Sequence, residues 1–178
     1  MVIKNYMDEI KILQRGSYYM TPFYEHHIRE IHSILHPETE KELSNLGYST
    51  VLEALQDLQK DSEVYIVRDK HWNIMMASGV FFSEEPPQLF ALFTNHITKN
   101  FKGLARGSKL LISFLDQSYE DLSMQIDAKY ESMLNWAVWL GFHPVGFSDW
   151  KNIRYIDFVR CNPSKNCVSD KTSRPVIH

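Results

Sequence analysis

The stretch that decides the fold is FKGLARGSKLL, residues 101–111. It places small residues at 103, 105 and 107, between the apolar, strand-like run Leu89–Thr94 and the amphipathic, helix-like run Ser108–Leu115. Small residues let a backbone loop approach a ligand closely, and the amides that open a helix attract anions. Lysine or arginine at positions 99, 102, 106 and 109 adds positive charge around this opening, as a phosphate-bearing ligand would require. The pattern indicates either a phosphorylated cofactor or a plain connection from strand to helix, and both interpretations stay open.

Composition predicts one globular domain in a reducing compartment. The chain has 178 residues, of which 44% are hydrophobic and 13% aromatic, enough for a substantial core. Its formal charge of −3 argues against a nucleic-acid partner. We see no secretory segment and no apolar run that could span a bilayer. Because the two cysteines, Cys161 and Cys167, make no disulfide framework, we expect a cytoplasmic protein with no membrane association.

The domain is predicted to cover residues 1–160. The remaining residues, 161–178, are rich in Ser, Lys, Asn and Pro and have no apolar period. Such a segment offers no face to a core, so we expect a mobile tail.

Helix signals dominate the first third of the chain. Thr21 and Pro22 suggest an N-cap followed by a proline at the first helical position, so a helix is predicted over 22–35. Thr50 and Glu53 have the spacing of a capping box, which predicts a second helix over 50–59. The other predicted elements are strands at 9–14, 63–68, 74–82 and 88–94, a helix ending near 115, a strand at 122–127, a helix at 130–140 and strands at 142–147 and 152–159.

This order of elements resembles the GNAT acyltransferase superfamily. The cofactor loop of that family runs Gln or Arg, two residues, Gly, one residue, Gly or Ala, and the matching segment here is KGLARG, residues 102–107. A second landmark, LGFHPVGF at 140–147, is similar to the family's LGF-x-PVG passage into the sixth strand. A closer resemblance is to GNAT-like proteins of short-tailed phages, some of them labelled internal virion proteins. It is carried by the segments 28–30, 43–47, 53–55 and 76–80.

The resemblance implies an α/β (α+β) fold. A mixed, mostly antiparallel central sheet would be flanked by helices, with a V-shaped split between the fourth and fifth strands, here 88–94 and 122–127. It also implies acetyl-coenzyme A as cofactor, with no metal. The residues expected to face its pantetheine arm are Leu92, Phe93 and Thr94, and those expected around its pyrophosphate are Lys102, Gly103, Leu104, Ala105, Arg106, Gly107 and Ser108. The region 36–48 would shape the choice of acceptor.

The catalytic residues are less clear from the sequence. Many active members of the family have a tyrosine four residues before the glycine of LGF, as the acid that protonates the leaving thiolate, and Ala137 stands there in this chain. Tyr130 or Tyr119 would have to substitute for it. A base could come from Glu85, with its neighbour Glu84, or from His96, although a surface position is the simpler interpretation for these residues. Asp127 is expected to cap the helix that begins at 130.

Histidines near the amino terminus do not predict a metal site. His32 and His36 have helical spacing, but no nearby acidic residue completes a ligand set.

Two functions therefore remain. The first is a phage-encoded acetyltransferase that acts on an amine of a host protein or of a small molecule. The second is a GNAT-fold protein that has lost its chemistry and serves as a virion structural or host-interaction partner.

Overall fold

In the computed structural model, residues 10–82, 84–97 and 101–163 are described. Within these ranges, eight strands form one sheet in the order β1-β2-β3-β4-β5-β6-β8-β7. The strands are β1 (Leu13–Arg15), β2 (Tyr18–Pro22), β3 (Ser62–Arg68), β4 (Ile74–Phe81), β5 (Gln88–Phe93), β6 (Asp121–Asp127), β7 (His143–Trp150) and β8 (Ile153–Cys161). The helices are α1 (Glu25–Ile34), α2 (Pro37–Leu46), α3 (Val51–Asp61), α4 (Phe101–Ser118) and α5 (Glu131–Trp139), with a short 3₁₀ turn η2 (Asn95–Ile97).

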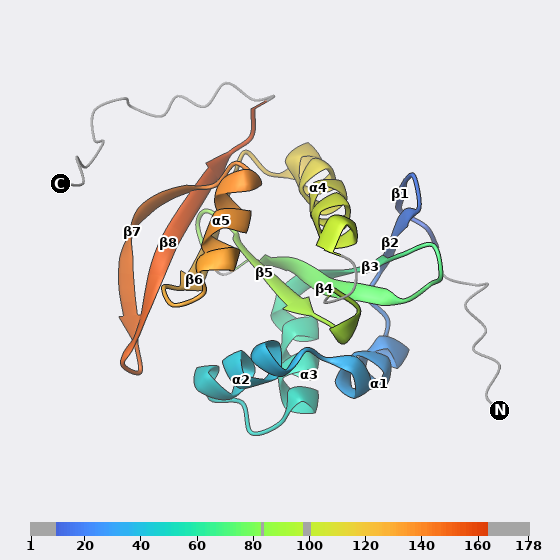
Figure 1. Cartoon of the computed structure of the whole chain (residues 1–178), viewed down its shortest axis with the longest axis horizontal. Helices are drawn as coiled ribbons and strands as arrows, with labels where there is room; N and C mark the ends of the chain where they lie inside the picture. Colours follow the sequence, from blue (N-terminus) through green and yellow to red (C-terminus); the bar gives the residue numbers. More distant parts are fainter. Residues whose placement is uncertain (1–9, 83, 98–100, 164–178) are drawn as a thin grey trace.

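The sheet separates two groups of helices. Figure 1 shows α4 and α5 on one face and α1, α2 and α3 on the other. Neighbouring strands run antiparallel except β5 and β6, which are parallel. The predicted fold class, a mixed and mostly antiparallel sheet flanked by helices, is confirmed.

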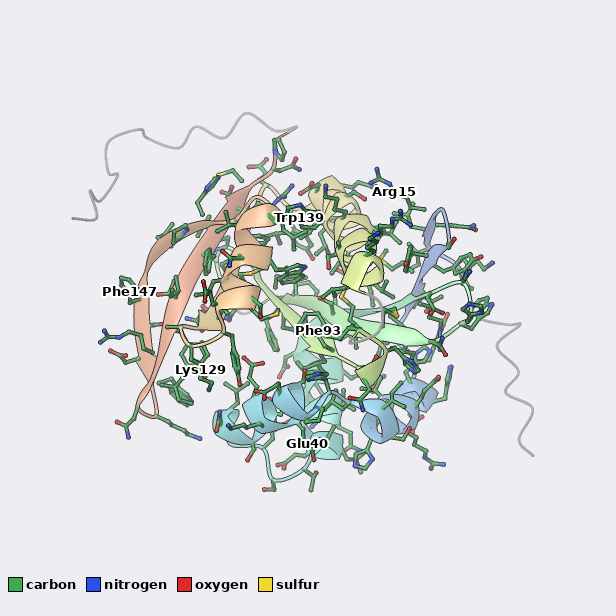
Figure 2. All side chains as sticks on the ribbon, viewed as in Figure 1. Arg15, Glu40, Phe93, Lys129, Trp139 and Phe147 are labelled. Atoms are coloured by element: carbon green, nitrogen blue, oxygen red, sulfur yellow. The ribbon has the colours of Figure 1, made fainter. Side chains whose placement is uncertain are left out.

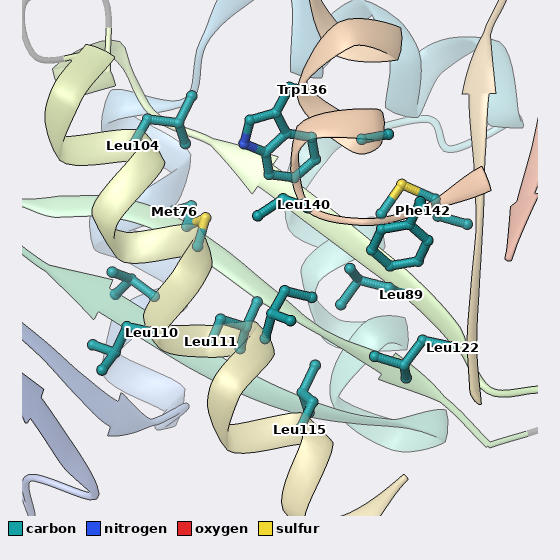
Figure 3. Packing of buried hydrophobic residues seen from close by; sticks show 14 of the residues in the cluster. Met76, Leu89, Leu104, Leu110, Leu111, Leu115, Leu122, Trp136, Leu140 and Phe142 are labelled. Carbon is teal, nitrogen blue, oxygen red and sulfur yellow. The ribbon is translucent and has the colours of Figure 1, made fainter. Parts of the chain in front are cut away.

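Each face of the sheet has its own hydrophobic core. The core under α4 and α5 includes Leu104, Leu111, Trp136 and Phe142 (Figure 3). Successive residues of a strand point to opposite faces, so Phe93 of β5 belongs to this core and its neighbour Leu92 to the core under α1–α3.

Strand β4 lies in the middle of the sheet and accepts no extra bulk. Seven of its eight residues are buried. A Cβ on Gly79 would lie 1.8 Å from the carbonyl oxygen of Glu63 on β3. Glycine is therefore required where these two backbones meet.

The amino-terminal helix prediction was wrong at its start. Thr21 and Pro22 do not open a helix but end β2, which pairs with β3. Thr21 is fully buried in the sheet, and α1 begins only at Glu25. The opening strand, predicted at 9–14, is β1 at Leu13–Arg15, and Glu9 lies outside the described residues. Helix α2 was not predicted at all.

The second helix follows its predicted cap. The Thr50 hydroxyl accepts the backbone N–H of Glu53 (3.1 Å), and the Glu53 carboxylate accepts that of Ser49 (2.9 Å). These bonds satisfy amide groups that the helix itself leaves unpaired. Helix α3 therefore starts where the sequence places it.

The carboxy-terminal hairpin is confirmed, with a tighter turn than predicted. Lys151 and Asn152 both adopt positive φ (46° and 65°), the conformation that suits a two-residue turn between twisted strands. Strand β8 continues to Cys161, and Asn162 is buried and donates from Nδ2 to the carbonyl oxygen of Tyr119 (3.2 Å). These first two residues of the predicted tail are thus part of the fold. Residues 164–178 lie outside the described residues, and their mobility stays a prediction.

Candidate functional site

The two parallel strands β5 and β6 separate along their length. In the described chain, their pairing is limited to Gln88 with Ser123, where the backbone N–H of Ser123 donates to the carbonyl oxygen of Pro87 (3.0 Å). Beyond this point the strands diverge towards Thr94 and Asp127. This is the V-shaped split predicted between the fourth and fifth strands, and we call the end at Thr94 and Asp127 its open end.

The predicted pantetheine residues lie on one side of the V. The side chain of Leu92 packs under α1–α3, and that of Phe93 meets the indole of Trp136 at a centroid distance of 5.8 Å. The hydroxyl of Thr94 donates to the carbonyl oxygen of Ile74 (2.5 Å). All three side chains are buried, so it is the main chain of β5, facing β6, that is placed to meet a ligand. At the open end, the N–H of His36 donates to the carbonyl oxygen of Phe93 (2.9 Å).

The predicted pyrophosphate loop is helical. Helix α4 begins at Phe101, so Lys102–Ser108 forms its first two turns and not a loop before it. The sequence placed the helix later because glycine has low helix propensity. Lys102 and Arg106 are exposed, whereas Gly103, Leu104, Gly107 and Ser108 are buried and Ala105 is half-buried. The segment therefore provides amides at a helix start and two exposed cations, which together suit an anion.

Gly107 has a packing role. A Cβ at this position would lie 2.8 Å from Cγ1 of Val67 on β3. Ser108, the next residue, donates its hydroxyl to the carbonyl oxygen of Leu104 (2.8 Å). Gly107 thus lets α4 lie close to the sheet, and the Ser108 hydroxyl is satisfied within the helix.

The predicted catalytic residues lie at two different ends of the V. Tyr130 follows Asp127, and His96 follows Thr94, so both lie near the open end of the V. Glu85 is exposed and precedes β5, at the closed end. Strand β5 has six residues, which at about 3.3 Å per residue place Glu85 roughly 20 Å from the open end.

Tyr130 connects the two faces of the molecule. It stands just before α5, and its hydroxyl donates to the carboxylate of Glu38 on α2 (2.7 Å). Burial and this bond raise the pKa of Tyr130, which keeps the phenol protonated and able to donate. Tyr119, the alternative acid, instead donates to Glu63 (3.0 Å) at the far end of α4. Burial and that bond raise the pKa of Tyr119 to about 12.

A group of carboxylates and tyrosines surrounds the open end. Its members, which we call the open-end cluster, are Glu38 and Glu42 of α2, Asp127 at the end of β6, Tyr130 and Tyr155 of β8. Burial raises the pKa of Glu42, and the negative charge of Asp127 raises it further. The pKa of Tyr155 is raised by burial and then by the charges of Glu42 and Asp127.

One cation belongs beside this cluster. The side chain of Lys129 forms an ion pair with the carboxylate of Asp127. The backbone N–H of Lys129 also donates to that carboxylate (3.0 Å). The expected helix cap at Asp127 was wrong: its carboxylate closes the turn before α5, and Tyr130 is the N-cap of that helix, with no side-chain cap hydrogen bond. Figure 2 shows Lys129 in this turn, between α5 and α2. Its charge partly offsets the acidic groups.

The sequence indicated Glu38 and Glu42 only as part of the region 36–48, and it did not indicate Tyr155 or Trp136 as site residues. Pro37 at the start of α2 and Gly47 after its end (φ 108°) were signals for the helix that carries the two glutamates. Tyr155 and Trp136 gave no local signal.

The described residues contain neither a metal-binding group nor a membrane-spanning helix. Across the described ranges, no group of three His, Cys, Asp or Glu side chains could hold a metal ion. No helix of the same residues is long and apolar enough to cross a bilayer.

Comparisons with known proteins bear on the fold. A scan against protein-family models and a search of curated proteins give no match. Solved structures do match: a GNAT-family acetyltransferase from Bordetella pertussis superposes with a TM-score of 0.65 and 14% identity over 85% of this chain and all of that one.

Two other matches name their acceptors. The ribosomal-protein-S5-alanine acetyltransferase of Vibrio fischeri gives a TM-score of 0.61 at 14% identity, covering 87% of this chain and 98% of that one. Spermidine N-acetyltransferase from Vibrio cholerae, solved with CoA and spermine, gives 0.62 at 9% identity, covering 83% and 97%. The chain therefore has the fold of the GNAT acetyltransferases.

Proposed function

We propose that this protein is an acyltransferase that uses acetyl-coenzyme A and acetylates an amine. The observation that carries the proposal is the V between β5 and β6, with the start of α4 on one side and the open-end cluster at its mouth. Two solved acetyltransferases of similar fold act on an alanine of a ribosomal protein and on spermidine, and they support an amine acceptor.

The coenzyme side of the V fits its ligand. Strand β5 pairs with β4 along its whole length, but its other edge, towards β6, has no strand partner within the described residues between Gln88 and the contacts of residues 35 and 36 with Phe93 and Thr94. An amide-containing arm could hydrogen-bond there as a further strand would. We assign Leu92–Thr94 to this arm and the opening of α4, from Lys102 to Ser108, to the phosphates. When bound, the coenzyme supplies the acyl group as a reactive thioester.

The open-end cluster supplies acid–base groups for the acceptor. In the transfer, the amine nitrogen bonds to the acyl carbon as the carbon–sulfur bond breaks. Glu42 takes the proton that the amine loses, and Tyr130 gives a proton to the departing sulfur. A base works best with a pKa near the operating pH, and the raised pKa of Glu42 moves it in that direction. His96 is the second candidate for the base.

The acidic charge of the cluster favours a cationic acceptor. The cluster contains three carboxylates, those of Glu38, Glu42 and Asp127. Among the described residues, Lys129 is the one cation beside them. A protonated amine is attracted to such a site before it loses its proton.

The finer expectations rest on the sequence resemblance and on the composition of the chain. They are a phage gene, action in the host-cell cytoplasm, a host or virion protein as partner and the absence of a nucleic-acid partner. All of them stay predictions.

A specific observation favours the second candidate function, a GNAT-fold interaction protein without turnover. Ala137, fully buried, stands where the family has its tyrosine, and no hydroxyl replaces it at that position.

Two measurements in sequence, coenzyme binding and then acetyl transfer, distinguish the acyltransferase from the interaction protein. Binding of acetyl-coenzyme A is measured first, by calorimetry. At 100 times the dissociation constant, binding should stabilise the protein by about 2.7 kcal/mol, seen as a raised melting temperature. Acetyl transfer is then assayed by release of free thiol with spermidine and with a peptide carrying a free amino terminus. Binding with transfer supports the proposal. Binding without transfer to any amine supports the interaction protein, and failure to bind coenzyme contradicts the acyltransferase.

A further inference from the structure

Trp136 has a polar atom that the fold does not use. The side chain is 8% exposed and meets Phe93 edge to face, at an interplanar angle of 83°. Its indole nitrogen is buried and has no hydrogen-bond partner among the described residues. Leaving a buried N–H unpaired is unfavourable, and phenylalanine would pack in this position without that penalty.

The indole lies between the two elements that border the V on the coenzyme side. It extends from α5 towards α4, and Figure 3 shows its nitrogen on the side of Leu104, in the first turn of α4. The ring contacts Phe93, a residue of β5 beyond the point where that strand leaves β6. The ring therefore lies between the side chain of Phe93 on β5 and the start of α4, with its unpaired donor on the side of α4.

We infer that the indole N–H of Trp136 donates a hydrogen bond to an amide oxygen of the pantetheine arm of coenzyme A. This inference rests on the proposed function and adds a residue to its site. The surroundings decide which oxygen is involved. Leu104, Leu140 and Met76 belong to the same buried core as Trp136, and an apolar wall disfavours a charged phosphate more than a neutral amide. The phosphates belong further out, where Lys102 and Arg106 are exposed.

Trp136→Phe tests the inference, because it keeps an aromatic ring and removes the N–H. Calorimetry compares coenzyme A with adenosine 3′,5′-bisphosphate, which has no pantetheine arm. We expect coenzyme A to bind roughly three- to tenfold more weakly, as the loss of one hydrogen bond predicts, with unchanged affinity for the bisphosphate. The melting temperature without ligand should fall modestly, because phenylalanine is smaller than tryptophan and leaves space in the core; the affinity for the bisphosphate controls for this change in packing. Trp139→Phe is the matched control on the same helix, where the indole is 47% exposed.

A direct readout comes from the indole ¹H–¹⁵N resonances. The chain has four tryptophans, so the peak missing from Trp136→Phe identifies the residue. Coenzyme A should shift that peak, and the bisphosphate should leave it in place.

The possible failures are distinguishable. If the wild type binds no coenzyme A, the proposed function and this inference both fall. If the wild type binds and Trp136→Phe binds equally well, the inference is wrong and the proposed function stands. Equal weakening of both ligands would also overturn it, because the substitution would then act through packing.

Discussion

The two sides of the V are built differently along the chain. The coenzyme side at α4 comes from one continuous segment, with Lys102–Ser108 forming the first turns of a single helix. The open-end cluster combines side chains from α2, from the turn after β6 and from β8, so that Glu38 and Tyr155 are separated by more than half the sequence.

This difference determines what a sequence can reveal. Small residues at fixed spacing before an apolar helix form a local pattern, and the pattern is visible without a structure. Glu42 has no such pattern around it, because its neighbours in space, Asp127 and Tyr155, join it only when the sheet forms. Experiments on the two sides should therefore differ in kind, with turnover depending on the open-end cluster and packing on α4.

The largest effect is expected from Glu42→Gln. This substitution keeps the shape of the side chain and removes the base, so acetyl transfer should fall by about 10²–10⁴-fold with coenzyme affinity retained. The measurement is steady-state release of free thiol, with calorimetry for affinity. Glu40→Gln removes one charge from an exposed position of the same helix and should leave the rate unchanged. A rate for Glu42→Gln equal to wild type would move the base elsewhere, first to His96.

Tyr130→Phe should have the next largest effect. Loss of the proton donor lowers turnover by at least about tenfold while coenzyme affinity is preserved. The matched control is Tyr119→Phe, since Tyr119 also donates to a glutamate (3.0 Å) but at the other end of α4. Both variants lose one hydrogen bond of similar kind, so their stabilities should change alike and their rates should not. If Tyr119→Phe slows transfer as much as Tyr130→Phe, the effect is structural.

Much of the fold could be predicted because its signals are local. The cap of α3, the end of α5 at Gly141 and the hairpin of β7 and β8 each depend on residues close together in the sequence. The errors came from signals that tertiary pairing overrides. Thr21 and Pro22 resemble a helix start, yet they pair with Ile66 and Tyr65 on β3.

Helix α2 is an element that the sequence analysis did not predict, although it is present in the structure. Only Thr39 and Leu43 are buried along it, so it has almost no apolar stripe for a periodicity argument to find. The helix that supplies Glu38 and Glu42 therefore has signals at its two ends, Pro37 and Gly47, but little apolar periodicity between them. The candidate site was predictable on the side of α4 and largely hidden on the side of α2.

On the side of α4, Gly107→Ala should destabilise the protein without touching the open-end cluster. The new Cβ would meet Val67 at 2.8 Å, and such overpacking costs about 1–3 kcal/mol, reduced by up to about 1 kcal/mol because alanine favours helix. Urea denaturation measures the free energy of unfolding. Gly146→Ala is a control with ordinary room, since its nearest contact would be 3.8 Å from Asp157.

A second substitution, at Val67, shows whether close packing is the reason that Gly107→Ala destabilises the protein. Val67→Ala makes space opposite residue 107, so the double variant should lose less stability than the two single variants together. Additive losses would show that Gly107 is needed for its conformation or its ligand and not for close packing. A bulky residue such as valine at 107 would confuse loss of coenzyme with loss of fold, and is therefore a poor test of the phosphate site.

The smallest expected effect is a pH-dependent gain of stability in Glu42→Gln. The pKa of Glu42 is raised above its ordinary 4.5 by burial and by Asp127, so the folded protein binds this proton more tightly than the unfolded chain does. The wild type is thus favoured below about pH 4.5 and loses this contribution as the pH rises through the folded-state value. Glutamine has no charge to bury, so the variant should match the wild type at low pH and be more stable at pH 7. Denaturation at both pH values checks this, and a variant less stable than wild type at pH 7 would show that the Glu42 carboxylate is held by a favourable contact. In that case the residue would be a structural anchor of α2, and the base would have to be sought outside the open-end cluster.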